Sequence, residues 1–238
     1  MKQAYTFEIC AVNIQSALAA QAAGAHRIEL CSALDAGGIT PSPGLIRAAV
    51  EALDIPVNVL IRPREGGFCY TDTELDIMLS DIRFCREVGV NGIVVGALNM
   101  HGQLDIAKLA AMRDAADGME LAHHRAFDFS ADPVESLEQL IALGYRRVLS
   151  SGQSNSAFEG RFLLQKLVNQ ANGRISIMPG AGIDATNIHA IATTTGATEF
   201  HFTGKVKVDP SKGNPIQGLD TWYWQSDVAV IRGIMEAV

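Results

Sequence analysis

No Cys-x-x-Cys pair occurs among the four cysteines of this 238-residue sequence, which excludes zinc-ribbon and thioredoxin-type motifs. No stretch approaches the roughly 18 consecutive apolar residues of a membrane span. The N-terminal segment Met1–Cys10 lacks the apolar core of a signal peptide. Together these absences predict a cytoplasmic protein that keeps its thiols reduced and has no membrane partner.

Runs of basic residues are also missing. The formal net charge is −7, from 19 Lys and Arg against 26 Asp and Glu. An acidic chain without a basic run is a poor nucleic-acid binder, so no nucleic-acid partner is expected, and arginines would have to gather locally to hold an anion. With 48% hydrophobic and 19% charged residues, the composition is that of a globular chain rather than a disordered one.

Eight short β-rich runs recur along the chain, and a segment with helical periodicity follows each of them. The runs are Tyr5–Cys10, His26–Cys31, Val57–Arg62, Gly92–Ala97, Met119–His124, Arg147–Ser151, Arg174–Met178 and Thr198–Phe202. This alternation predicts a single (β/α)8 TIM barrel over residues 1–238. An open doubly wound sheet is the competitor, but the first strand–helix turn lacks a Gly-x-Gly-x-x-Gly fingerprint. The segment from about 204 to 225 is expected to be an irregular loop before the last helix.

Alternation within the runs predicts which side chains face the barrel interior. Apolar residues must face the helices, so their polar neighbours face inward, and in TIM barrels the sites lie at the carboxyl ends of the strands. The polar residues expected to meet there are Glu8, Glu29, Arg62, Arg64, His124, Asp128 and His201. The alternative is an ion-pair plug in which the two glutamates pair with the two arginines.

Cys10 and Cys31 occupy matching points of neighbouring strands and have the same inward parity. Two nearby thiolates, with Met178 or a histidine as a further ligand, would suit the soft ion Cu(I). The alternative is that both cysteines are small apolar core residues, since free cysteine is among the most buried residue types.

Two further segments suggest chemistry on an anion. A histidine beside a carboxylate can move protons, and His124 is followed by Asp128, although a structural hydrogen-bond network is an equal alternative. Gly180 and Gly182 precede a helix predicted to begin at Asp184, where backbone N–H groups could approach an anion. Glycine is also common in any tight strand–helix loop.

Several segments, in order along the chain, resemble the CutC family of copper homeostasis proteins. They are Arg27–Leu34, Gly37–Ser42, Ile61–Arg64, Gly66–Tyr70, His124–Asp128, Val148–Gln153, Ile177–Gly182 and Glu199–His201. The resemblance implies a TIM barrel, a cytoplasmic location, a homodimer and Cu(I) binding through cysteine. Phe202–Lys205 departs from the family pattern, in which small residues are expected there.

Two main functions therefore compete. In the first, the protein binds Cu(I) through Cys31 and Cys10 at the mouth of the barrel. In the second, it is an enzyme that acts by acid–base chemistry on a small anionic, phosphorylated or carboxylated, substrate. The enzyme hypothesis assigns anion binding to Arg62, Arg64, Gly180 and Gly182, and catalysis to Glu8, Glu29, His124, Asp128 and His201. A third alternative is an interaction protein with a vestigial site.

Overall fold

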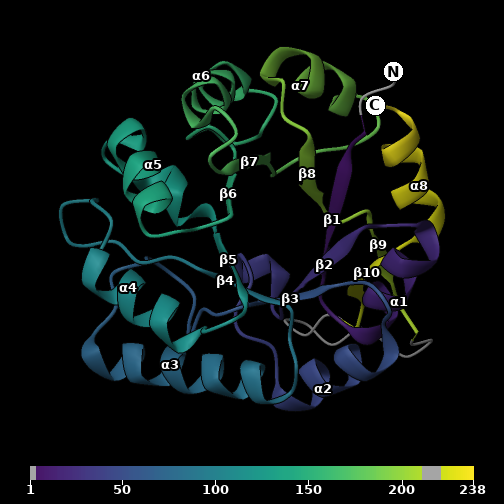
Figure 1. Ribbon diagram of the computed structural model, residues 1–238. Helices are drawn as coiled ribbons and strands as arrows, with labels where there is room; N and C mark the ends of the chain where they lie inside the picture. Colours follow the sequence, from purple (N-terminus) through teal and green to yellow (C-terminus); the bar gives the residue numbers. More distant parts are fainter. Residues whose placement is uncertain (1–3, 211–220) are drawn as a thin grey trace.

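Eight parallel strands form a ring with helices around its outside (Figure 1). The computed structural model describes residues 4–210 and 221–238. The strands of the ring are β1 (Thr6–Ala11), β2 (Arg27–Leu30), β3 (Val57–Leu60), β4 (Gly92–Val95), β5 (Glu120–His123), β6 (Arg147–Ser150), β7 (Ser176–Pro179) and β8 (Glu199–Phe202). Their order is β7-β6-β5-β4-β3-β2-β1-β8, and a parallel bridge between Gly180 and His201 joins the two ends. The prediction of a TIM barrel is confirmed.

Helices connect successive strands, as parallel neighbours require. They are α1 (Ile14–Ala23), α2 (Pro43–Ala52), α3 (Asp72–Glu87), α4 (Ile106–Ala115), α5 (Pro133–Ala142), α6 (Arg161–Ala171), α7 (Ile188–Thr195) and α8 (Val228–Glu236), with short 3-10 helices η1 (Leu34–Ala36) and η2 (Arg125–Phe129). Local sequence sets their starts: Thr71 and Glu74 form a capping box at α3, and Asp132 caps α5 ahead of Pro133. No helix in the described part of the chain is long and apolar enough to cross a membrane.

The apolar core lies between the strands and the helices. Ile9, Ile28, Val59 and Phe200 point outward into it and are fully buried. Removing each such side chain from water contributes roughly 1.5–3 kcal/mol. The intervening residues therefore face the barrel axis, which confirms the strand parity inferred from the alternation.

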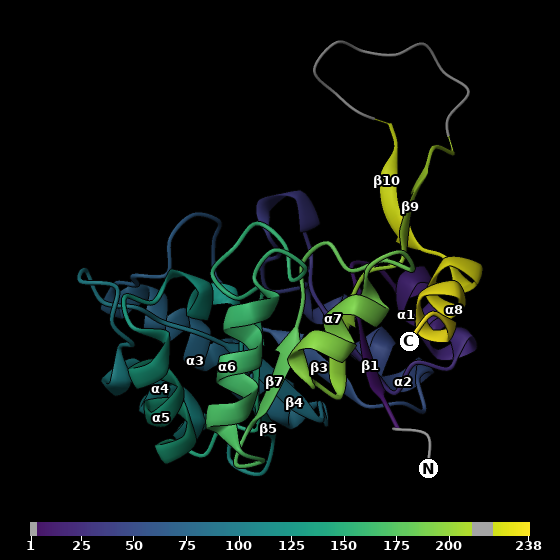
Figure 2. The ribbon, with the colours of Figure 1, turned by 90° about the horizontal axis from the view of Figure 1, so that it is seen from above.

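The segment expected to be an irregular loop contains an antiparallel hairpin instead. Strands β9 (Lys205–Val208) and β10 (Tyr223–Ser226) pair with Lys207 opposite Trp224, and the hairpin projects from the barrel (Figure 2). Residues 211–220 of that segment lie outside the described residues. The loop prediction was wrong here because it overlooked the alternating Lys-Val-Lys-Val sequence and the aromatic residues at 222–224, both of which favour strands.

Candidate functional site

A cavity of about 480 Å³ opens at the carboxyl ends of the barrel strands. Of the residues predicted to form a site there, seven line it: Cys10, Glu29, Cys31, Arg62, His124, Gly182 and His201. They come from opposite parts of the ring, and the structure brings them together as the strand parity indicated. Four others do not line the cavity: Glu8, Arg64, Asp128 and Gly180.

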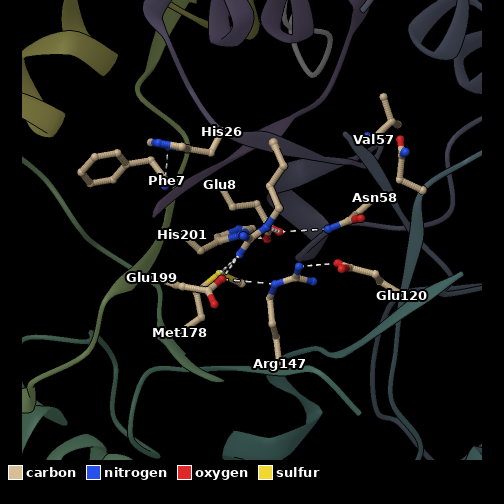
Figure 3. A network of polar contacts seen from close by, with 12 residues as sticks. Phe7, Glu8, His26, Val57, Asn58, Glu120, Arg147, Met178, Glu199 and His201 are labelled. Carbon is tan, nitrogen blue, oxygen red and sulfur yellow. Dashed lines mark hydrogen bonds and ion pairs between the residues drawn. The ribbon is translucent and has the colours of Figure 1, made fainter. Parts of the chain in front are cut away.

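A layer of charged side chains lies inside the barrel toward the amino ends of the strands (Figure 3). Arg27 Nε donates to Glu8 Oε2 at 2.6 Å, and its Nη2 donates to Glu199 Oε2 at 2.5 Å. Arg147 bonds both Glu199, at 3.2 Å, and Glu120. These residues alternate in charge, so the layer is internally compensated. It replaces the branched apolar layers that usually fill such a barrel.

Glu8 connects this layer to the cavity above it. Its Oε1 lies 2.8 Å from His201 Nδ1, and Asn58 Nδ2 donates to its Oε2 at 3.2 Å. Burial opposes ionisation of Glu8, but the bonds from His201 and Arg27 overcome it and hold the carboxyl pKa far below its usual value. Burial likewise opposes charge on His201, yet Glu29, Cys10 and Glu8 raise the pKa of its imidazole well above the ordinary value. Without a metal the pair is therefore a carboxylate and an imidazolium, and a metal ion bound at Nε2 would displace the proton on that nitrogen.

Cys10 and Cys31 form the floor of the cavity on one side. Their Sγ atoms are 3.5 Å apart, and both side chains are buried. Single ligand atoms of Cys10, Glu29 and His201 all lie within 4.8 Å of one another. The hydrogen bond with Cys31 and burial raise the pKa of the Cys10 thiol well above its ordinary value. Burial and the Glu8 carboxylate raise the pKa of Glu29 to about 7, and its Oε2 has no hydrogen-bond partner among the described residues.

The opposite wall carries Arg62 and His124, with Phe68 between them. The Arg62 guanidinium carbon lies 5.2 Å from the Phe68 ring centre, and the His124 ring lies 5.1 Å from it. His124 caps η2, where its Nδ1 accepts a hydrogen bond from the backbone N–H of Ala126 at 3.1 Å. Burial, with His123 and Arg62 nearby, lowers the pKa of His124 well below its usual value, so this imidazole is neutral.

Two predicted site residues have other roles. The Arg64 side chain is 40% exposed, pairs with Glu74 of α3 and does not line the cavity with Arg62. Asp128 does not orient His124. Its carboxylate accepts from Ser150 Oγ at 2.6 Å, from the Ser151 backbone N–H and from Arg125 Nε at 2.9 Å, which joins η2 to the end of β6.

The glycine loop also differs from the prediction. α7 begins at Ile188 rather than at Asp184, because Asp184 Oδ1 accepts from the Thr186 N–H and forms a turn. The N-cap residue of α7, Asn187, lies five positions after Gly182 and donates from Nδ2 to its backbone carbonyl at 2.7 Å. Gly180 instead provides room for a side chain, since a Cβ there would lie 2.4 Å from Leu149 Cδ1.

The expected ion-pair plug exists, but with other partners. Glu8 pairs with Arg27 rather than with Arg62 or Arg64, while Glu29 pairs with neither arginine. Arg27 and Arg147 were missed as members of the interior, whereas strand parity places Asn58 there together with Arg62. The same parity held the signal for Arg27, which lies two positions before Glu29 on its strand.

Known relatives agree with this architecture. A profile of the CutC family matches residues 5–206. The chain belongs to the CutC family. A protein of Pasteurella multocida named as a family protein CutC is 45% identical over 97% of this chain and 98% of its own length. A CutC protein of Xanthomonas campestris (strain B100) is also 45% identical, over 96% and 97% of the two chains.

Solved structures extend the CutC comparison to three dimensions. A crystal structure from Streptococcus agalactiae, named for copper homeostasis and CutC, is 38% identical, with a TM-score of 0.80 over 84% of this chain and 98% of that one. A phosphoribosylanthranilate isomerase from Thermotoga maritima has a TM-score of 0.59 at 12% identity over 98% and 97% of the chains. The second similarity shows the barrel fold alone.

Proposed function

We propose that this CutC family member serves copper homeostasis by binding Cu(I) with Cys10, Cys31 and His201 at the floor of the cavity. The observation that carries the proposal is the 3.5 Å separation of the two sulfur atoms. Metal–sulfur bonds of about 2.3 Å allow two sulfurs on one ion to lie no more than about 4.6 Å apart. The two thiols are therefore close enough to share an ion, and soft sulfur ligands select Cu(I) over hard cations.

The surroundings of His201 support its role as a third ligand. Nδ1 is bonded to Glu8, which leaves Nε2 for the cavity, and a ligand atom of His201 lies within 4.8 Å of those of Cys10 and Glu29. A carboxylate on the far nitrogen is the usual support of a metal-binding histidine, because it fixes the ring orientation and increases the basicity of the ligand nitrogen. Glu29 lies within the same group and supplies a carboxyl oxygen.

The proposal includes a cytoplasmic location and a homodimer, as the family resemblance implies. The four cysteines are all free, which suits a compartment that keeps thiols reduced. Sedimentation velocity on the purified chain tests the oligomeric state, and a monomer at micromolar concentration would contradict that part.

Competition with a chromophoric Cu(I) chelator under anaerobic, reducing conditions tests the copper site. Cys10→Ser and Cys31→Ser should each weaken Cu(I) binding by at least 100-fold. Cys69→Ser is the matched control, because Cys69 is exposed and outside the cavity lining, and it should bind as wild type does. Unchanged binding in both cavity variants would contradict the proposal.

A second candidate function is acid–base chemistry on a small anionic substrate. It is favoured by three residues of the cavity lining that each have a buried polar atom without a partner among the described residues: Glu29 Oε2, Arg62 Nε and His124 Nε2. Such atoms are costly unless a ligand satisfies them. Deuterium exchange into small carboxylic and phosphorylated substrates, followed by NMR, tests this candidate. Exchange that is lost in Glu29→Gln would support it, and the absence of exchange across the set would contradict it.

A further inference from the structure

The guanidinium of Arg62 is a buried charge without a counter-ion in the described part of the chain. The residue is 5% exposed, and its hydrogen bonds go to the backbone carbonyls of Ala36, Gly38 and Gly66, at 2.7–2.9 Å. None of the ion pairs of residues 4–210 and 221–238 includes it. Arg62 lines the cavity, and its buried Nε has no hydrogen-bond partner among the described residues. Buried charges are normally paired, so we expect an anion to bind beside this cation in the cavity.

His124 presents a second donor beside it. The Nδ1 atom accepts from the Ala126 N–H, so in the neutral ring the proton is on Nε2. His124 lines the cavity, and this buried N–H has no partner among the described residues. Gly96 packs against the Cε1–Nδ1 edge of the ring, where a Cβ would lie 2.5 Å from Cε1, so the imidazole is held in place.

We propose that Arg62 Nε–H and His124 Nε2–H bind the carboxylate of a small organic acid on the β3–β5 wall of the cavity. Both residues contact Phe68 from within about 5 Å, so the two donors lie on the same wall. The site is independent of the copper proposal, because the thiols and His201 come from β1, β8 and the end of β2. It supplies the ligand class that the second candidate function requires.

Charge favours a carboxylate over a phosphate. One unpaired buried guanidinium is neutralised by one negative charge, whereas a phosphate dianion would leave excess charge in a site of low polarity. The other cations at the rim do not change this balance. Arg125 already pairs with Asp128, and Lys205 is exposed and lies 3.9 Å from the Trp224 ring centre. Leu60, Leu149 and Ile183 line the same cavity and would contact the carbon skeleton of the acid.

Ligand titrations of the whole protein test the site, with acetate, lactate, malate and inorganic phosphate as probes. Isothermal titration and the ¹⁵N chemical shifts of the His124 imidazole give two readouts. A carboxylate should move the Nε2 resonance and leave the tautomer unchanged, which a purely structural histidine would not show. Affinity should fall at least tenfold in His124→Phe, which keeps an aromatic ring beside Phe68, and in Arg62→Lys, which keeps the charge but removes Nε–H.

Arg64→Gln is the matched control, because this arginine lies two positions away and outside the cavity, and its variant should bind as wild type does. The double variant Cys10→Ser, Cys31→Ser should also keep carboxylate binding, whereas Cu(I) binding should survive His124→Phe. If His124→Phe and Arg62→Lys fail to fold, the His124 Nε2 resonance of the wild-type protein still shows whether a carboxylate binds there. An unmoved resonance with every carboxylate, or tighter binding of phosphate than of any carboxylate, would overturn the proposal.

Discussion

Glu8 stands directly opposite Arg27 on one side and opposite His201 on the other, and it bonds both. The three residues come from β2, β1 and β8, so a single carboxylate connects three neighbouring strands inside the barrel. Because this carboxylate is fully buried, its removal leaves two cationic groups in the interior without their shared partner. The relationship indicates that Glu8 supports the cavity, whose lining does not include it.

Glu8→Gln is therefore expected to lower the free energy of unfolding by about 3 kcal/mol or more, as for other broken buried pairs. Urea denaturation followed by circular dichroism measures the change. Glu138→Gln serves as a control, because Glu138 and Arg174 form an ion pair in which both side chains are about half exposed, with an expected effect below about 1 kcal/mol. Similar losses in the two variants would show that the interior pair is no more important than a surface pair.

His123 is expected to make stability depend on acidity. Burial lowers the pKa of its imidazole to about 4, from 6.5. The folded protein therefore resists protonation at this residue, and its contribution to stability, about 3 kcal/mol, is complete above pH 6.5 and is lost as the pH falls to 4. His123→Phe should flatten the stability profile between these values, since a phenyl ring fits beside Phe127 and Tyr145.

Thermal unfolding at pH 4.5, 5.5 and 7 checks the slope of that profile. The exposed His101 has no such burial, so His101→Gln should retain the wild-type slope. A His123→Phe profile as steep as that of wild type would assign the acid sensitivity to other groups.

Gly96→Ala should disturb His124 specifically. The added methyl group would lie 2.5 Å from His124 Cε1 and 3.0 Å from Ala126 Cβ, so the imidazole must shift from its hydrogen bond with the Ala126 N–H. Overpacking of this kind costs about 1–3 kcal/mol. Gly233→Ala is the matched control: in α8 a Cβ meets nothing within 4 Å, and alanine should stabilise that helix by about 0.5–1 kcal/mol. Chemical denaturation of both variants measures the free energy of unfolding, which should fall in Gly96→Ala and rise in Gly233→Ala.

The β9–β10 hairpin can be followed by its own fluorescence, since the chain has only two tryptophans, Trp222 and Trp224. Lys207 Nζ lies 3.8 Å from the Trp222 ring centre. Lys207→Ala removes this cation–π contact, worth about 0.5–1 kcal/mol at an exposed site. The emission spectrum should therefore change while the far-UV melting temperature of the barrel stays within about 2 °C of wild type. Lys166→Ala, on the exposed face of α6, should change neither the spectrum nor the melt.

Strand parity is the part of this fold that the sequence encodes most directly. Alternate apolar residues such as Phe7 and Ile9, or Phe200 and Phe202, face the helices, so the intervening Glu8 and His201 are identified as interior residues without coordinates. The proximity of Cys10 and Cys31 follows from the same rule, because both stand near the carboxyl ends of adjacent strands. Seven of the predicted residues accordingly reach one cavity.

Pairing between interior residues depends on the register of neighbouring strands. The alternation of apolar and polar residues within one strand does not determine that register. Register places Arg27, rather than Arg62, opposite Glu8. Residues beyond the strand ends are less predictable still, since loop geometry directs them. Arg64 turns outward to Glu74, and Asp128 turns toward Ser150, although both lie close in sequence to residues that do line the cavity.

The alternating charges of Arg27, Glu199, Arg147 and Glu120 fill the barrel axis beneath the thiols. A solute thus has no passage through the barrel from below, and the rim at the carboxyl ends of the strands is its entrance and its exit. Copper and an organic acid would therefore reach their opposite walls of the cavity through the same opening.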